Sequence, residues 1–134
     1  MIVQALFFHN CNGLRLSKMK HINSGKNHIS INDCNNVVIS DIHISAPEQS
    51  PNTDGIDISQ SKNVLIQNSL IATGIKLMLR FSVIIKYIIL CFYLFLLLLI
   101  SLLNIVGDDC IAINNGSSNI NIVGITCGPG HGIR

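Results

Sequence analysis

The strongest constraint on the fold is a motif that recurs along the chain at near-constant spacing. Runs that mostly alternate apolar and polar residues follow Asn36, Asn63 and Asn119, with a fainter copy after Asn12. In the numbering, successive copies are separated by 24, 27 and 56. Alternation with β-branched residues is typical of strands. Repeats of this length, each with two or three short strands, favour coils of a parallel β-helix. An antiparallel β-sandwich, which also has many short strands, is the alternative.

The last separation is out of line because an apolar segment interrupts the repeat. Residues 75–106 number 32, and removing them reduces that separation to 24. We therefore expect one all-β domain, because 134 residues suit a single core. Its coils occupy residues 1–74, residues 75–106 are an insertion, and residues 107–134 continue the same β-helix.

The insertion has three possible interpretations. A membrane span is one, since the stretch from Tyr87 to Leu103 includes no polar side chain except Ser101 and the Tyr hydroxyls, and its length is at the short edge of what crosses a bilayer. A surface loop is the second, although it would expose a large apolar patch. A retained intron is the third, and the restored period favours it. Residues 80–103 lack Gly and Pro and are predicted to form a helix.

Composition limits the partners and the compartment. A net charge of +2 gives no reason to expect nucleic acid, and a membrane partner is expected only if residues 80–103 are a genuine span. The first residues do not resemble a signal peptide. Five cysteines without a CxxC motif argue against zinc and leave one or two disulfides possible. Four histidines are interpreted as surface or satisfied polar positions: His9, His21, His28 and His43.

Three polar clusters break the strand pattern: "NTDGID" (52–57), "GDDC" (107–110) and "GPGHG" (128–132). Without the insertion, Asp54 precedes Asp108 by one coil length, and Asp109 precedes His131 by the same length. The clusters should therefore stack on one face. Neighbouring carboxylates raise each other's pKa, so one can donate a proton while another accepts one, which glycosidic bond cleavage requires. Taken singly, each cluster is more typical of an ordinary turn or a solvated surface than of a site.

The motifs "SPNTDGIDIS", "GDDCIAI" and "CGPGHGI" together resemble the polygalacturonases, the pectin-degrading glycoside hydrolases, and the plant enzymes most closely. The resemblance covers everything but the apolar segment and the extreme ends of the chain. It implies a right-handed parallel β-helix that hydrolyses α-1,4 bonds between galacturonic acids with inversion. It further implies pectin or polygalacturonate as the partner, no metal, no cofactor and an extracellular, cell-wall location.

The resemblance also assigns roles to individual residues. It makes Asp108 the general acid, and it makes Asp54 and Asp109 the residues that activate water. His131 would tune the protonation of the acid, and Asn52 would line a substrate subsite. A disulfide between Cys110 and Cys127 is implied as well.

The chain departs from the family in one respect that bears on activity. The family has an Arg-x-Lys motif that grips substrate carboxylates, and Arg134 need not be its arginine. We therefore expect little or no hydrolysis from these 134 residues alone. A non-catalytic, pectin-binding or membrane-associated β-helix is the alternative, whereas a pectate lyase would need calcium and an arginine base. Endo and exo cleavage are not distinguished.

Overall fold

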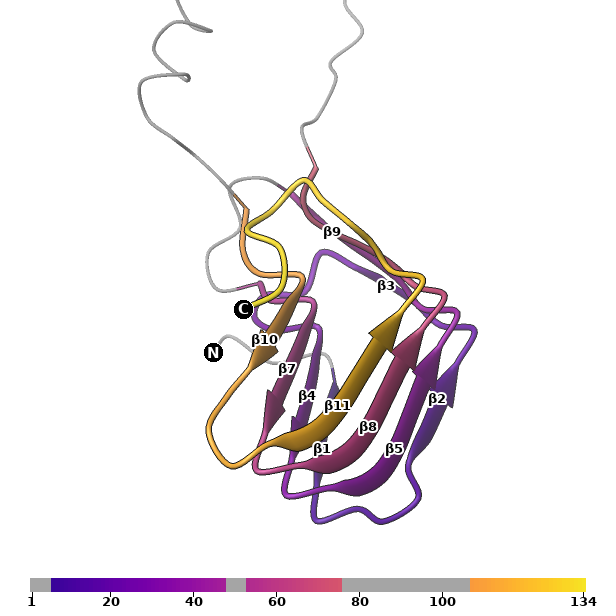
Figure 1. The fold of residues 1–134 in the computed structure, drawn as a ribbon. Coiled ribbons are helices and arrows are strands. Elements are labelled where there is room, and N and C mark those ends of the chain that lie inside the picture. The colour runs from indigo at the N-terminus through magenta and orange to yellow at the C-terminus, as the bar shows by residue number, and fades with distance from the viewer. Residues whose placement is uncertain (1–5, 48–52, 76–106) are drawn as a thin grey trace, which may run out of the picture.

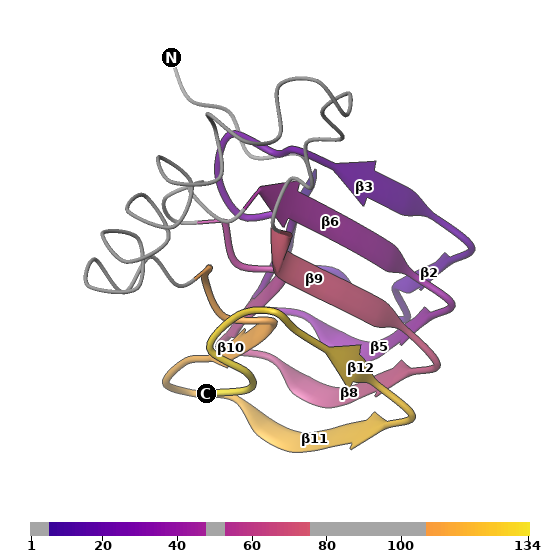
Figure 2. The same ribbon diagram turned by 90° about the horizontal axis from the view of Figure 1, so that it is seen from above.

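The chain folds into strands that form three parallel sheets (Figures 1 and 2). The structure is a computed structural model that describes residues 6–47, 53–75 and 107–134. The strands are β1 (Leu6–His9), β2 (Arg15–Ser17), β3 (Lys20–Ile22), β4 (Ile29–Asn32), β5 (Asn35–Ser40), β6 (His43–Pro47), β7 (Ile56–Ser59), β8 (Lys62–Gln67), β9 (Leu70–Ile75), β10 (Ile111–Ile113), β11 (Ser118–Val123) and β12 (Thr126–Cys127).

Each coil contributes one strand to each sheet. The sheet orders are β1-β4-β7-β10, β11-β8-β5-β2 and β12-β9-β6-β3, and every pairing is parallel. A sandwich would pair consecutive strands antiparallel, so the prediction of a parallel β-helix is confirmed. Strand β10 pairs directly with β7 although the apolar segment lies between them in sequence.

Isoleucines and valines of successive coils lie directly above one another in the core. Ile29, Ile56 and Ile111 are register partners and are fully buried. Further stacks are Ile31/Ile58/Ile113, Val37/Val64/Ile120 and Ile39/Ile66/Ile122. Burying one such side chain stabilises the fold by about 1.5–3 kcal/mol. Because parallel coils repeat the same inward positions, the apolar period of the sequence becomes a continuous core.

One corner of the coil is built from stacked asparagines. Asn36, Asn63 and Asn119 adopt left-handed backbone conformations with φ of 54–56°, which asparagine tolerates better than most residues. Each donates a hydrogen bond from its side-chain amide to the asparagine of the preceding coil, down to Asn12. We call these four residues the asparagine ladder. The prediction that Asn36, Asn63 and Asn119 occupy equivalent positions of successive coils is confirmed.

Three sequence runs alternate apolar and polar residues without a break, yet each of them turns a corner of the coil in the structure. Residues 37–44 divide between β5 and β6, 64–71 between β8 and β9, and 120–126 between β11 and β12. Left-handed residues make these corners, namely Asp41, Asn68 and Gly124. Alternation alone misses them because the apolar residues on both sides still point into the same core.

The expectation that His28 is a surface or satisfied histidine is wrong. Its side chain is fully buried, and neither ring nitrogen has a hydrogen-bond partner among the described residues. Its ring packs edge-on against His21, with centroids 6.3 Å apart. Burial, with a smaller contribution from His21, lowers the pKa of His28 to about 4. In register, His28 is level with Gly55, so no side chain of the next coil stacks on it there.

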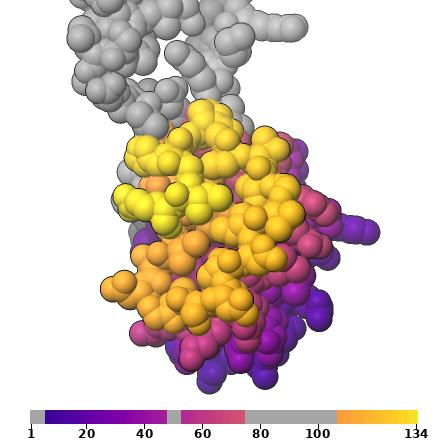
Figure 3. Space-filling view, in the orientation of Figure 1, coloured from indigo at the N-terminus to yellow at the C-terminus, as the bar shows by residue number. Residues whose placement is uncertain are grey.

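The last coil forms the face seen in the space-filling view, where its residues are orange to yellow (Figure 3). The helix predicted for residues 80–103 lies outside the described residues. Within the described ranges no helix is long and apolar enough to cross a bilayer.

Candidate active site

The predicted acids meet where the chain enters β7 and β10. Ile56 of β7 pairs with Ile111 of β10. Two residues before each of them, the same register places Asp54 beside Asp109. The sequence alignment that placed Asp54 level with Asp108 is therefore off by one residue. It assumed an offset of 54 in the numbering, whereas β7 and β10 pair at an offset of 55, as Ile56 with Ile111. We call Asp54, Asp108, Asp109 and His131 the acid corner.

His131 reaches the acid corner from the next turn of the chain. An isolated parallel bridge joins Ile111 to Ile133, which places His131 beside Asp109 at the one-coil spacing that the sequence indicates. The backbone N–H of His131 donates to the carbonyl oxygen of Asp108 at 3.1 Å. The histidine is thus held to the acids through the main chain as well as through its ring.

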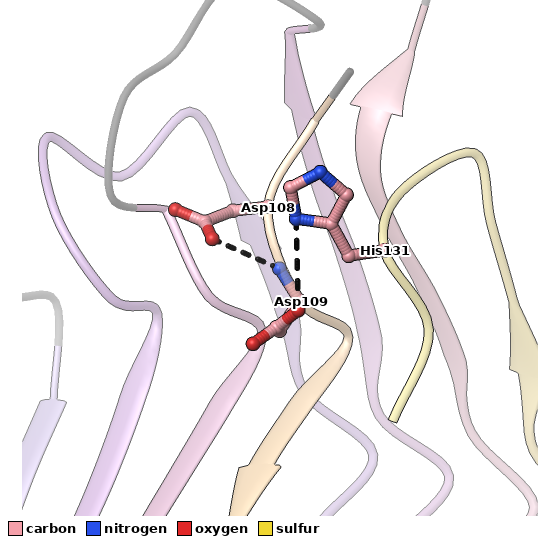
Figure 4. A group of neighbouring side chains, drawn as sticks. All are labelled: Asp108, Asp109 and His131. Carbon is pink, nitrogen blue, oxygen red and sulfur yellow. Dashed lines mark hydrogen bonds and ion pairs between the residues drawn. The ribbon is translucent and has the colours of Figure 1, made fainter. Parts of the chain in front are cut away.

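The carboxyl groups of Asp54 and Asp108 converge on one amide. The backbone N–H of Asp109 lies 3.2 Å from Oδ1 of Asp54 and 3.1 Å from Oδ1 of Asp108 (Figure 4 shows the second contact). Two negative charges held against one amide resist joint ionisation, so one proton shared between the two carboxyl groups is favoured. We call Asp54 and Asp108 the proton-sharing pair.

The pKa of Asp54 is raised to about 7. Burial is the largest cause, followed by the hydrogen bond to Asp108 and the negative charges of Asp108 and Asp109. The hydrogen bond from the N–H of Asp109 opposes the shift. The amide that Asp54 and Asp108 both contact holds the two carboxyl groups together, so the proton of Asp54 lies beside Asp108. The acid corner therefore keeps a transferable proton near neutral pH.

Asp109 has a different environment. Its side chain is 1% exposed, and neither carboxylate oxygen accepts a hydrogen bond from the described residues. Its charge is met by ion pairs instead, with Nε of Arg134 at 3.1 Å and Nδ1 of His131 at 3.7 Å when the imidazole is protonated. Figure 4 shows the imidazole directed at this carboxylate. A charged carboxylate with unused acceptor sites is suited to taking a proton from water.

The main chain of Asp108 is fixed by Thr73 from the preceding coil. The N–H of Asp108 donates to the carbonyl oxygen of Thr73 at 3.0 Å, and the Thr73 hydroxyl donates to the carbonyl oxygen of Asp108 at 2.6 Å. Thr73 is fully buried. A side chain at Gly107 would collide with the Thr73 carbonyl, so the close approach requires glycine there.

A disulfide joins Cys110 to Cys127, with the Cα atoms 6.0 Å apart. Cys110 is fully buried and directly follows Asp109, whereas Cys127 ends β12 and precedes the segment that carries His131. The bridge therefore fixes both chain segments of the acid corner. Cys11 and Cys34 are free thiols.

The same side chains could also hold a metal ion. Asp108, Asp109 and His131 each offer one ligand atom, and these atoms lie within 4.8 Å of one another. Carboxylate and imidazole ligands suit several divalent ions. That no metal takes part, as the resemblance implies, stays a prediction.

Sequence reasoning missed two residues of the site, and a third lies outside the structure. Thr73 gave no motif signal, although it sits in "IATG" just before the apolar segment. Arg134 was not assigned to a site, yet it pairs with Asp109. Asn52, predicted to bind substrate, lies outside the described residues.

Comparison with known proteins agrees with this geometry. The family model described as "Glycosyl hydrolases family 28" matches residues 3–75 and 99–134. The chain is 47% identical over 129 residues to a probable polygalacturonase of Arabidopsis thaliana and 35% identical to polygalacturonase-2 of Solanum lycopersicum. Each alignment covers 96% of this chain and 21% of the relative.

An exopolygalacturonase of Zea mays is 34% identical over 91% of the chain, and the chain covers 22% of that relative. The chain thus spans about a fifth of the length of these curated relatives. The family model matches the coils on both sides of the apolar segment, including all four residues of the acid corner. The relatives named here are plant polygalacturonases, and the chain itself belongs to glycosyl hydrolases family 28.

Proposed function

We propose that the acid corner hydrolyses α-1,4-galacturonosyl bonds of pectin by an inverting acid–base mechanism. The observation that carries the proposal is the convergence of the Asp54 and Asp108 carboxyl groups on the N–H of Asp109, beside the ion-paired, hydrogen-bond-poor carboxylate of Asp109. The raised pKa of Asp54 agrees with this geometry. An acid and a base held side by side with different protonation supply both proton transfers of glycoside hydrolysis.

Asp108 takes the role of general acid. It is less buried than Asp109, and its carboxyl group meets that of Asp54 at the N–H of Asp109, where Asp54 can pass it a proton. As the bond between the anomeric carbon and the leaving oxygen breaks, Asp108 protonates that oxygen. The Thr73 contacts hold the main chain of Asp108, so that its carboxyl group stays oriented toward the leaving oxygen.

Asp109, assisted by Asp54, activates the water that attacks the anomeric carbon. Asp109 carries most of this role because Asp54 shares a proton with Asp108. The water gives its proton to Asp109 as the new carbon–oxygen bond forms. His131 and Arg134 offset the charge of Asp109, and His131 tunes the protonation of Asp108 through its position beside both acids.

The segment 75–106 is, in this proposal, an insertion into an otherwise regular β-helix, of the retained-intron kind. Two observations support this: β10 pairs with β7 as the next coil, and the family match leaves out residues 76–98. A bilayer between Asp54 and Asp109 is incompatible with the hydrogen bond from the Asp109 N–H to the Asp54 carboxylate. Sequencing a transcript across codons 74–107 tests the idea, because a spliced form lacking the segment is expected.

The location proposed is extracellular, in the cell wall. The support is the Cys110–Cys127 disulfide, which suits an oxidising compartment, together with the likeness to plant polygalacturonases.

Activity is tested by grafting. In a grafted protein, the matching coils of the Arabidopsis relative are replaced by residues 6–74 joined directly to residues 107–134. The assay measures the release of reducing ends from polygalacturonate. We expect hydrolysis by the graft and a loss of about 10²-fold or more in its Asp108→Asn variant. A folded graft that binds polygalacturonate without cleaving it would refute the enzymatic proposal in favour of a binding module.

The chain of 134 residues is assayed in parallel, and we expect little or no hydrolysis from it. Efficient cleavage by this chain would show that neither further coils nor removal of the apolar segment is needed.

A further inference from the structure

The corner between β10 and β11 is longer than the matching corner one coil earlier. Ile58 pairs with Ile113, and Lys62 pairs with Ser118. The four residue steps between β7 and β8 therefore correspond to five steps between β10 and β11. The extra length is taken up in the turn at Asn115 and Gly116, whose φ is +81°. Figure 1 shows this connection in orange at the lower left. The turn is therefore a local protrusion of an otherwise regular stack.

Asn115 lies exposed in this turn. Among the described residues its side-chain amide has no partner, although its carbonyl oxygen accepts a hydrogen bond from the N–H of Gln60. The neighbouring Asn114 differs, because its amide donates to Oδ1 of Asp57. Of these two adjacent asparagines, Asn114 is hydrogen-bonded to the preceding coil, whereas the side-chain amide of Asn115 has no partner among the described residues.

Asn115 also begins the sequence Asn115–Gly116–Ser117. None of the other asparagines in the 134 residues is followed two positions later by Ser or Thr. Asparagine, any residue except proline, then Ser or Thr is the acceptor sequence of N-glycosylation, which needs an exposed loop in a protein of the secretory route.

We propose that Asn115 is an N-glycosylation site. The inference rests on the extracellular location in the proposed function. In the transfer, Nδ2 of Asn115 bonds to the anomeric carbon of an oligosaccharide carried on a lipid pyrophosphate. The bond between that carbon and the phosphate oxygen breaks, the lipid pyrophosphate leaves with the electron pair, and the amide nitrogen loses one proton.

The position of the turn decides what the glycan covers. Asn115 follows the end of β10, whereas Asp109 precedes its start, so the six intervening steps place them about 20 Å apart along an extended chain. A glycan there flanks the outer corner of the coil and leaves the acid corner open. Loss of the glycan is therefore expected to leave hydrolysis by the graft unchanged.

The test is translation of the full chain behind a secretory leader, with a C-terminal tag, in the presence of microsomal vesicles. Only chains whose tag is protected from added protease are scored. We expect a slower band that an endoglycosidase removes, with the modification mapped to residue 115 by mass spectrometry. Asn115→Gln and Ser117→Ala should abolish it, whereas Ser117→Thr should keep it.

Two control variants sharpen the result. Asn114→Gln removes the adjacent asparagine and should keep the modification. Val123→Thr creates a second acceptor sequence at Asn121 and should add a second glycan, which shows that the transferase acts on this part of the chain.

An unprotected tag, or protected chains without a glycan at Asn115, would overturn the proposal. Persistence of the glycan in Asn115→Gln would do the same. None of these readouts depends on hydrolysis, so they stand apart from the test of the acid corner.

Discussion

The asparagine ladder and the acid corner are both columns of polar residues at stacked corners of the coil, yet they differ in how their members meet. In the ladder the same residue recurs in every coil, and each amide donates to the asparagine of the preceding coil. In the acid corner the residue changes from coil to coil. Asn27, Asp54 and Asp109 follow one another in register, and His131 follows them.

The difference lies in the chemistry of the side chains. An amide both donates and accepts, so a stack of amides satisfies itself and can be extended without cost in charge. A carboxylate only accepts, so two stacked carboxylates must share a proton or repel each other. Stacking in successive coils therefore gives register and stability at the ladder and a transferable proton at the acid corner. Substitutions in the two columns test this contrast.

The largest effect is expected from Asp109→Asn in the grafted protein. Hydrolysis should fall by a factor of about 10² or more, because an amide cannot accept the proton of water. The free energy of unfolding should not fall, because the change removes a buried charge beside Asp54 and Asp108. Turnover on polygalacturonate and urea unfolding are the measurements. A parallel loss of stability and activity would mean that Asp109 is a structural residue like those of the ladder.

The opposite result is expected from Asn63→Ala at the centre of the ladder. The free energy of unfolding should fall by about 2 kcal/mol, from lost amide hydrogen bonds and from alanine at φ of 54°. Activity per folded molecule should be unchanged. Asn63→Gly is the matched control, since it loses the same bonds without the φ strain and should cost less. Equal losses of stability in the two variants would show that backbone strain at residue 63 contributes nothing to the effect.

The pH dependence of stability should separate Asp54 from the ladder. Asp54 has a pKa of about 7 in the folded chain and about 4 when unfolded, so the folded state binds the proton more tightly. Its contribution to stability is therefore complete below pH 4 and is lost as the pH rises through 7.

In Asp54→Asn this loss, on the order of 1–2 kcal/mol after screening by solvent, should disappear. Thermal unfolding of both proteins from pH 4 to pH 8 measures it. The difference isolates Asp54, because His28 is present in both. Asn63→Gly serves as the control, and its difference from the unsubstituted chain should not vary with pH. Parallel profiles for Asp54→Asn and the unsubstituted chain would contradict the proton-sharing pair.

The smallest effect is expected from Thr73→Val in the graft. The variant keeps the buried volume and the main-chain hydrogen bond to Asp108 but loses the hydroxyl bond to the Asp108 carbonyl. A lost hydrogen bond of about 1 kcal/mol corresponds to a fall in kcat of roughly fivefold. KM should change little, because Thr73 is buried and positions Asp108 without touching substrate. Thr73→Ser should restore the rate, and a failure of this rescue would argue for packing instead of positioning.

The residues differ in how far the sequence reveals their positions. Ladder positions follow from spacing, because residues at equivalent places in stacked coils must meet. The stacked isoleucines follow in the same way. The partner of Asp54 was mistaken by one residue, since a count across the apolar segment cannot tell where one coil stops and the next begins.

The sequence by itself determined the parallel β-helix, the asparagine ladder and the set of residues that could meet at one corner. These depend on period and residue type, which a linear chain displays. Only the tertiary structure decided which atoms touch at that corner, including the amide that Asp54 and Asp108 share and the pairing of Arg134 with Asp109. It also placed His28 inside the fold, level with Gly55. The physical reason is that apolar–polar alternation does not reveal the corners, where backbone conformation and burial between coils set the direction of each side chain and the pKa of Asp54.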